Sequence, residues 1–537
     1  MGDKTRLILF LAVLLLLVGL VSSESENGQY YNGEVNASEI LEKIKQGEPL
    51  VKYDHVIVKG DLDFRQQKGL NTTHIARTQE QLEYLGLSEN QTQVNSSLTI
   101  NDSEIEGVVY MNDTLFWKQI NFEGSKFNGE DKDGASANFR GTTFNNGANF
   151  AGSSFNGDAR FEDSKFDGDA DFTFSKFNRN ANFTNSAFKS PAKFWYSFFN
   201  GHANFILSKF NKNAYFAGSR FNRDARFNVS TFNDETYFSD SIFNGLADFI
   251  GSKFNKNAYF KSSRFNNKVD FTGSTFNGDA YFEGARFNNE AGFNESTFKN
   301  ETYFDEANFA GVTHFYNSEF VGDALFQNAT FSEPLDLTRA KYDKLYIKWT
   351  NIKKELRYDE SAYQQLIENF KKLGYVSDVD KSYYEFRVEQ FRHPDDPVRR
   401  SADLIAWVTY GFGKQPIFPL IWSIMFVLLF GFVWWEIDKG KSDWFGIDSM
   451  KPDEYEYSSI EYVPISDRRW RNLLETLIFS ATVFLSGTRL FVDPPPVPAL
   501  KGMSGSLTKK LFIVERILGG CFTFLFFLTL TGMILKT

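Results

Sequence analysis

The sequence predicts a mainly β repeat rod, followed by a helical segment and a membrane domain with two spans. Phenylalanine recurs at alternating spacings of five and six residues from Phe139 to Phe331. The two interleaved series contain 36 of the 60 phenylalanines. Two long apolar runs lie near the C-terminal end. A period this strict means that each short unit buries its inner face only by stacking on its neighbours.

A secretory signal is predicted over residues 1–23. Lys4 and Arg6 precede an apolar run, and two serines follow it. This order is typical of a cleavable signal peptide, and an uncleaved signal anchor is the alternative. Both place the next segment on the outer side of a membrane.

Residues 24–113 are polar and rich in asparagine, and we expect them to lead into the rod or to cap it. A short amphipathic helix is predicted around 37–46, and Val56-Ile57-Val58 is typical of a strand. Irregular repeats begin at about Val108, so the predicted solenoid spans 114–335.

Eleven Asn-x-Ser/Thr acceptor sites precede the end of the rod, and none follows it. Six of them lie before the regular repeats, where turns do not require asparagine. An exterior, glycosylated N-terminal half is therefore predicted. The acceptor residues are Asn36, Asn71, Asn90, Asn95, Asn101, Asn112, Asn182, Asn228, Asn294, Asn300 and Asn328.

Small residues stand two positions before almost every phenylalanine of the rod, as at Ala148, Ala159, Ala170, Ala181, Ser153, Ser164, Ser175 and Ser186. Asparagine usually follows the second phenylalanine of a pair, as at Asn145, Asn156, Asn178, Asn200, Asn211 and Asn222. Asparagine tolerates left-handed turns, and its stacked side chains can form hydrogen-bonded ladders. We expect both roles at the corners of the rod.

This pattern resembles the pentapeptide-repeat family, with one extra residue in every second unit. The resemblance implies a right-handed quadrilateral β-solenoid built from an 11-residue double unit. Four sides then take about 22 residues, which gives roughly nine coils at a spacing of about 4.8 Å. The repeat itself specifies no chemistry, because the regular phenylalanines form the core.

Composition limits the partners and the chemistry. The net charge of −10 argues against nucleic acid, and the rod lacks the sustained acidic face of a DNA mimic. Cys521 is the only cysteine, so no intramolecular disulfide can form. The five histidines show no metal-ligand spacing, and no phosphate loop or nucleophile elbow occurs. We therefore expect no enzymatic activity, cofactor or metal.

A helical hairpin is predicted over 342–395. Apolar residues recur at helical spacing from Tyr342 to Phe391, Gly374 separates two helices and Pro394 ends the second. We expect this hairpin to cover the open apolar end of the solenoid, and binding a partner is the alternative.

The membrane domain is predicted over 401–537. Residues 416–435 form an uncharged apolar run that ends at two tryptophans, and 511–535 form a second span. Between them, 473–491 is shorter and contains Glu475, which fits a re-entrant segment packed within protein.

The order of span, short helix, loop and span resembles the two-transmembrane potassium-channel-like (pore-loop) family. The second span begins Ile513-Val514-Glu515-Arg516-Ile517-Leu518-Gly519-Gly520, similar to the start of that family's inner helix. Before the first span, Thr409-Tyr410-Gly411-Phe412-Gly413 resembles a filter sequence but is interpreted as a juxtamembrane turn. The resemblance makes five residues candidates for a pore or an intramembrane polar site: Glu475, Thr482, Ser486, Gly487 and Glu515.

Departures from that family argue against potassium selectivity. A filter needs a ring of backbone carbonyls, and the matching segment reads Thr482-Val483-Phe484-Leu485-Ser486-Gly487. Phe484 and Leu485 do not suit a backbone that glycine permits. The alternative interpretation of the acids is structural: Glu475 near a helix start, and Glu515 paired with Arg516 or Lys510.

Two functions remain open. One is a structural or interaction scaffold on the exterior of the plasma membrane, with an unknown surface ligand or protein partner. The other is an ion-channel-like pore, formed by a homo-oligomer through the membrane domain, with the solenoid as a sensing or docking part. An outside rod places the loop 436–510 inside, opposite to the channel family. Basic residues on both sides of the first span leave the topology open.

Overall fold

The protein is described by a computed structural model that covers residues 31–65, 67, 69–83, 87–393, 397–438, 468–495 and 505–531. The predicted signal segment, 1–23, lies outside these residues. The chain divides into two compact units, residues 1–362 and 363–537. The first contains the β-structure, and the second is helical.

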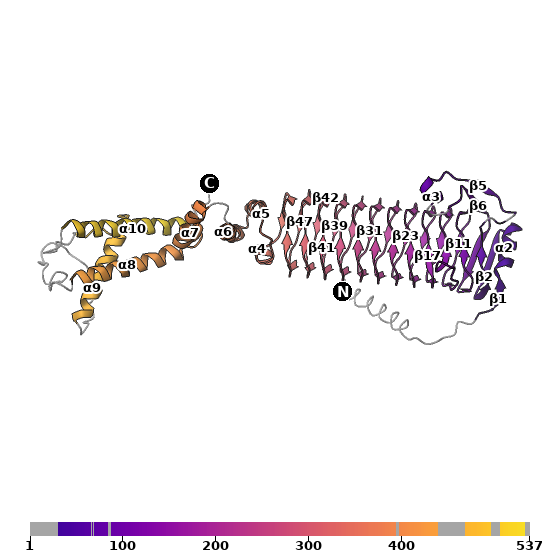
Figure 1. The fold of residues 1–537 in the computed structure, drawn as a ribbon, viewed down its shortest axis with the longest axis horizontal. Coiled ribbons are helices and arrows are strands. Elements are labelled where there is room, and N and C mark those ends of the chain that lie inside the picture. The colour runs from indigo at the N-terminus through magenta and orange to yellow at the C-terminus, as the bar shows by residue number, and fades with distance from the viewer. Residues whose placement is uncertain are drawn as a thin grey trace, which may run out of the picture. The chain divides into compact units, whose positions relative to one another are not determined.

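Four sheets form the sides of the first unit, which confirms the predicted β-solenoid (Figure 1). Three sheets have 13 strands and one has 12, and all pairs are parallel except β5–β6. Successive strands of one coil lie on successive sides. They are β15 (Ala148–Asn149), β16 (Ser154–Phe155), β17 (Asp158–Arg160) and β18 (Lys165–Phe166), and β19 (Ala170–Asp171) then returns to the first side. Each coil therefore takes 22 residues, as predicted.

The solenoid is longer than the roughly nine coils expected from phenylalanine. Its strands run from β1 (Gly33–Asn36) to β51 (Leu345–Tyr346). In the paired strands β3 (Val56–Lys59), β8 (Glu104–Ile105) and β12 (Lys126–Phe127), equivalent inward positions hold Val58, Ile105 and Phe127. The early coils were missed because their core residues are aliphatic. At the other end β50 (Lys341–Tyr342) and β51 occupy a stretch where a helix was expected.

Phenylalanine rings fill the interior in two arrangements. Phe194 stacks on Phe216, one coil away, with ring centroids 4.9 Å apart. Phe194 also meets Phe205, across the coil, edge-on at 5.3 Å and an interplanar angle of 86°. Both arrangements are favourable for aromatic rings. Stacking along the rod and edge contacts across it therefore join the rings into one continuous core.

Buried serines tie successive coils together at the small-residue positions. Ser241 Oγ donates to Phe216 O at 2.7 Å, and the same bond recurs from Ser197, Ser208 and Ser263. Small side chains are needed here because a larger one would enter the phenylalanine core.

We expect Ser241→Ala to lower the free energy of unfolding by about 0.5–1.5 kcal/mol, the usual net contribution of one hydrogen bond. The loss stays small because Phe216 O also accepts from Ser219 N. Ala285 and Ala307 hold equivalent positions, so the fold accepts alanine there. Urea denaturation followed by circular dichroism measures the change, and the outward Ser239→Ala is the control. A loss above about 3 kcal/mol would contradict this assignment.

The asparagines form the predicted ladders but do not make the left-handed turns. Asn178 Nδ2 donates to Asn156 Oδ1 at 2.6 Å, and the ladder continues one coil at a time to Asn288. Positive φ occurs instead two residues after a first-series phenylalanine, as at Phe174 with φ of 58°. The expectation that these asparagines make the turns was therefore wrong, and many residue types occupy the left-handed position.

Short helices close the ends of the first unit. The predicted N-terminal helix is α2 (Ala37–Lys45), and it buries Ile40, Leu41 and Ile44. After β51, α4 (Trp349–Ile352) buries Trp349 and Ile352. α5 (Glu360–Lys372) and α6 (Val376–Arg392) follow on either side of Gly374, whose φ is 72°. α5 spans the boundary of the two units, so a capping role for this hairpin stays a prediction.

The second unit contains the candidate membrane helices. α7 (Pro397–Tyr410) leads through the 3-10 turn Gly411–Gly413 into α8 (Ile417–Asp438). The last three residues of the filter-like sequence therefore form a turn, and Arg387 of α6 lies 5.2 Å from the Phe412 ring centroid. α9 (Arg468–Leu485) and α10 (Gly505–Thr531) complete the unit. α8 and α10 are long and apolar enough to cross a membrane.

Candidate functional site

Five tyrosines form a continuous column on the outside of one solenoid sheet. They come from β27 (Ala214–Tyr215), β31 (Thr236–Tyr237), β35 (Ala258–Tyr259), β39 (Ala280–Tyr281) and β43 (Thr302–Tyr303). Their rings stack with centroid distances of 4.8 to 5.1 Å. We call this side, residues 213–218 and their equivalents through 323–328, the tyrosine face.

Acidic side chains flank the tyrosine column. Tyr281 Oη donates to Asp279 Oδ2 at 3.1 Å, and Tyr237 and Tyr303 donate to the glutamates two residues before them. Lys261 Nζ lies 4.4 Å from the Tyr281 ring centroid and 2.9 Å from Glu283 Oε1. The column thus already binds one cation, the Lys261 ammonium, through a tyrosine ring and a carboxylate together.

The tyrosine column makes the stability of the solenoid depend on pH in the alkaline range. Burial, together with Asp279, raises the pKa of Tyr281 from 10.0 to about 12. The unfolded chain therefore releases this proton at lower pH than the folded chain, and stability falls as pH rises from about 10 through about 12. Urea denaturation across this range should show the fall, and Tyr281→Phe should reduce it. An equal fall in both proteins would contradict the assignment.

Glu515 lies at the centre of the helical unit rather than at an interface. Its carboxylate is fully buried, accepts from Trp434 Nε1 at 2.8 Å, and is hydrogen-bonded to the hydroxyl of Ser480. Ser480 Oγ also lies 2.9 Å from Val427 O. The expected ion pair with Arg516 or Lys510 is wrong. On a helix, consecutive residues point in different directions, and Arg516 Nε donates to Ser486 O at 3.3 Å instead.

The other candidate pore residues lie in or just after α9. Thr482 Oγ1 donates to Ile478 O, and the buried Ser486 Oγ donates to Val483 O. Thr482 to Leu485 are helical, so their carbonyls do not form the extended ring that a potassium filter needs. Glu475 lies two turns inside α9 and is half-buried, so its expected place near a helix start is wrong.

Glycines allow α9 and α10 to meet backbone to backbone. A Cβ on Gly519 would lie 1.9 Å from Phe484 O, and one on Gly487 would lie 2.3 Å from Arg516 O. Gly487 therefore has a packing role. Close approach through small residues is typical of helix pairs in membranes.

A cavity of about 510 Å³ opens between α8, α9 and α10. Its lining is almost wholly apolar and includes Ile424, Phe484 and Phe527. Ser423 and Thr523 contribute its only polar side chains, and it contains no charged residue, so the cavity suits hydrocarbon.

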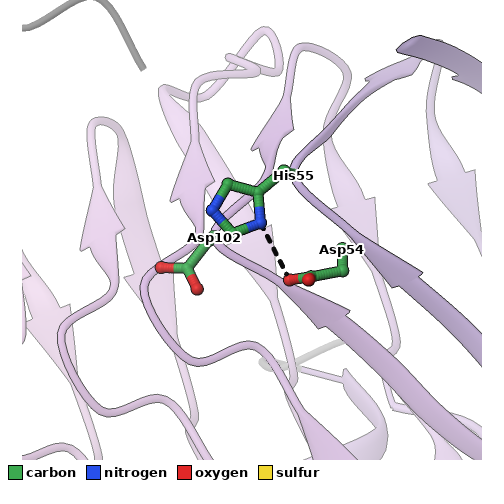
Figure 2. Close-up of side chains that lie close together, drawn as sticks. All are labelled: Asp54, His55 and Asp102. Carbon is green, nitrogen blue, oxygen red and sulfur yellow. Dashed lines mark ion pairs between the residues drawn. The ribbon is translucent and has the colours of Figure 1, made fainter. Parts of the chain in front are cut away.

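One acidic–histidine cluster lies near the start of the solenoid. His55 Nδ1 is 3.1 Å from Asp54 Oδ1, and Asp102 faces the same imidazole (Figure 2). One ligand atom from each lies within 4.8 Å of the others. Sequence spacing did not reveal this group, because Asp102 belongs to the next coil. His55 and Asp54 are 42% and 50% exposed, and such a set suits weak cation binding at most.

The eleven acceptor asparagines all lie on the outer surface of the solenoid. Asn182, Asn228 and Asn294 are half-buried, and Asn182 and Asn228 donate to carboxylates of neighbouring coils. Asn101 and Asn112 are also half-buried. The exposed set is Asn36, Asn71, Asn90, Asn95, Asn300 and Asn328. Glycosylation is therefore best tested at this second set.

Comparison with known proteins identifies the repeats. The family model for pentapeptide repeats (9 copies) matches residues 134–176, 206–253, 249–297 and 293–341. Over these residues the solenoid is thus similar to pentapeptide repeats, which supports the resemblance to that family. No curated protein and no solved structure is similar enough to this chain to count as a match.

Proposed function

We propose that the protein is a non-enzymatic interaction scaffold, held in the plasma membrane by α8 and α10 with its solenoid on the cell exterior. The observation that carries the proposal is the contrast between the two units. The solenoid buries its two regular phenylalanine series, and its sides are largely polar with scattered exposed apolar residues. α8 and α10 instead expose Ile421, Leu428 and Phe524 to more than half of their area.

The exterior orientation rests on sequence signals. The predicted signal segment and the acceptor asparagines both precede the membrane helices, and six of the asparagines are exposed. On an exterior solenoid, glycans at these positions would project from the corners and sides without entering the core.

Two measurements test this function. Alkaline carbonate extraction should leave the full chain in the membrane pellet, because α8 and α10 are buried in lipid. In a Cys521→Ser background, an impermeant thiol reagent should label Lys253→Cys on intact cells but not Ser458→Cys. Labelling of Ser458→Cys alone would place the solenoid inside and overturn exterior display. Release by carbonate would overturn anchoring.

A pore is the second candidate, favoured by the packing of α8, α9 and α10 in the order span, short helix, span. Glu475 and Glu515 are the polar groups that such a pore would use. Purified protein in liposomes would then pass ions, and Glu475→Gln would change the flux. Absence of flux with correctly inserted protein would exclude it.

A further inference from the structure

The side of the solenoid that follows the tyrosine face is basic. It comprises β20 (Lys176–Phe177), β24 (Phe198–Phe199), β28 (Arg220–Phe221), β32 (Ile242–Phe243), β36 (Arg264–Phe265) and β40 (Arg286–Phe287). The pentapeptides on this side, 175–179 and their equivalents through 285–289, contain no acid. We call this side the arginine face. Its cations are Lys176, Arg179, Arg220, Arg223, Arg264 and Arg286.

Four arginines of this face are unpaired in the structure. Arg220, Arg223, Arg264 and Arg286 are exposed and form no ion pair with any described residue. The tyrosine face is acidic, with Lys261 as its one cation from 213 to 328. Its acids are Glu235, Asp240, Asp279, Glu283, Glu301, Asp305, Glu306 and Asp323. The expectation that no side of the rod is continuously acidic was therefore wrong, because the acids are spread along the sequence and gather on one side only when the coil folds. One molecule thus presents two complementary sides.

We propose that the arginine face of one copy docks on the tyrosine face of a second copy. Guanidinium groups stack on tyrosine rings and bind carboxylates with two parallel hydrogen bonds, so one arginine can engage both components of the tyrosine face. Both faces repeat once per coil of the same solenoid, so the contact can recur from coil to coil without losing register. Lys261 shows the same ring-and-carboxylate arrangement within one copy.

The positions of the two faces set the size of the assembly. They are consecutive sides of a four-sided coil, as β27, β28 and β29 (Ala225–Arg226) on three different sheets show. Each added parallel copy is therefore turned by about a quarter of a revolution, and a head-to-tail contact with that rotation closes after four copies. The copies lie parallel because, under the proposed function, all are anchored in one membrane.

The contact area favours a closed ring over a single pair. In a closed ring all copies lie at one height, so the two faces overlap over four coils, from 213–223 to 279–289. Four coils at about 4.8 Å and five residues at about 3.3 Å give each contact roughly 320 Å². A stable interface buries about 800 Å² on each partner, so one such contact alone is weak. In a ring each copy uses both faces, which doubles its buried area to roughly 630 Å².

Cross-linking of the full chain tests this inference. In a Cys521→Ser background, we place cysteines on both faces at Asn267 and Ser239 and treat membranes with a short bismaleimide. Products of two, three and four chains are expected, with none larger. Variants with one of the two cysteines should give no product. Failure of the double variant to cross-link, products beyond four, or cross-linking of a single variant would overturn the proposal.

Charge reversal provides the specificity test. Changing Arg220, Arg264 and Arg286 to glutamate should abolish cross-linking, and so should changing Glu235, Asp279 and Glu283 to arginine. Co-expression of the two variants should restore it, because each then offers the face that the other lacks. The matched control reverses Lys165, Lys209 and Lys253, on another side, and should leave cross-linking unchanged. Loss without restoration would overturn the proposal.

These outcomes are distinct from those of the proposed function. Release of the chain by carbonate would show that it is not anchored in the membrane. The charge-reversal variants could then still be compared by cross-linking the released protein in solution. Conversely, an anchored chain that does not cross-link would keep the scaffold and overturn the ring. If the arginine face proves dispensable while a polyarginine peptide quenches tyrosine fluorescence, the tyrosine face serves a foreign cation and the proposal fails.

Discussion

Replacing Phe199 by alanine is expected to destabilise the solenoid by about 3–5 kcal/mol, the usual cost of emptying a buried phenylalanine site. Phe199 is fully buried, and its ring stacks on Phe177 and Phe221 at 4.8 Å on both sides. Its neighbours cannot collapse into the space, because the coils directly above and below hold the same ring in the same place.

The matched control is the adjacent residue of the same type. Phe198 lies on the same strand but points outward and is 39% exposed. We expect Phe198→Ala to cost less than about 1 kcal/mol, since surface positions contribute little. Urea denaturation of the purified chain, followed by its β-sheet circular dichroism, measures both. Equal losses would contradict the inward and outward assignment of the two rings.

Gly519→Ala is expected to disrupt the helical unit. The added methyl carbon would lie 1.9 Å from Phe484 O and 2.8 Å from Phe484 Cα, both backbone atoms that cannot rotate away. α9 and α10 must therefore separate, at a cost of about 1–3 kcal/mol or more for an overpacked site. That separation also weakens the Ser480–Glu515 contact, which joins the same two helices.

Gly520→Ala is the matched control for this change. Its methyl carbon would meet Gly487 at 3.3 Å, a contact that a small shift relieves. We expect the midpoint of thermal aggregation in detergent to fall for Gly519→Ala and to change little for Gly520→Ala. A similar midpoint for both variants would show that the two helices are not in backbone contact.

The solenoid could be predicted because its information is local and repeated. Each inward Phe, each small residue before it and each ladder asparagine recurs with the period of the coil. The first coils were not predicted because Val58 and Ile105 stand at positions that phenylalanine occupies in the later coils. The tyrosine column had a visible signal, Ala-Tyr-Phe or Thr-Tyr-Phe every 22 residues, but sequence alone does not show that outward rings stack.

The contacts of the helical unit could not be predicted in the same way. Glu515 meets Trp434 and Ser480, which are 81 and 35 residues away. No period relates these residues, and the sequence neighbours Lys510 and Arg516 suggested a local ion pair instead. Predicting such a site requires the packing of three helices.

The 22-residue coil makes the solenoid adjustable in length without redesign of its ends. Each regular coil bonds only to the coil before it and the coil after it, as Ala214 pairs with Ala192 on one side and with Thr236 on the other. Removing or duplicating one coil therefore rejoins equivalent surfaces and changes the rod by about 4.8 Å. Unequal recombination between gene segments that encode one coil would therefore change the distance between the two ends of the solenoid in steps of one coil.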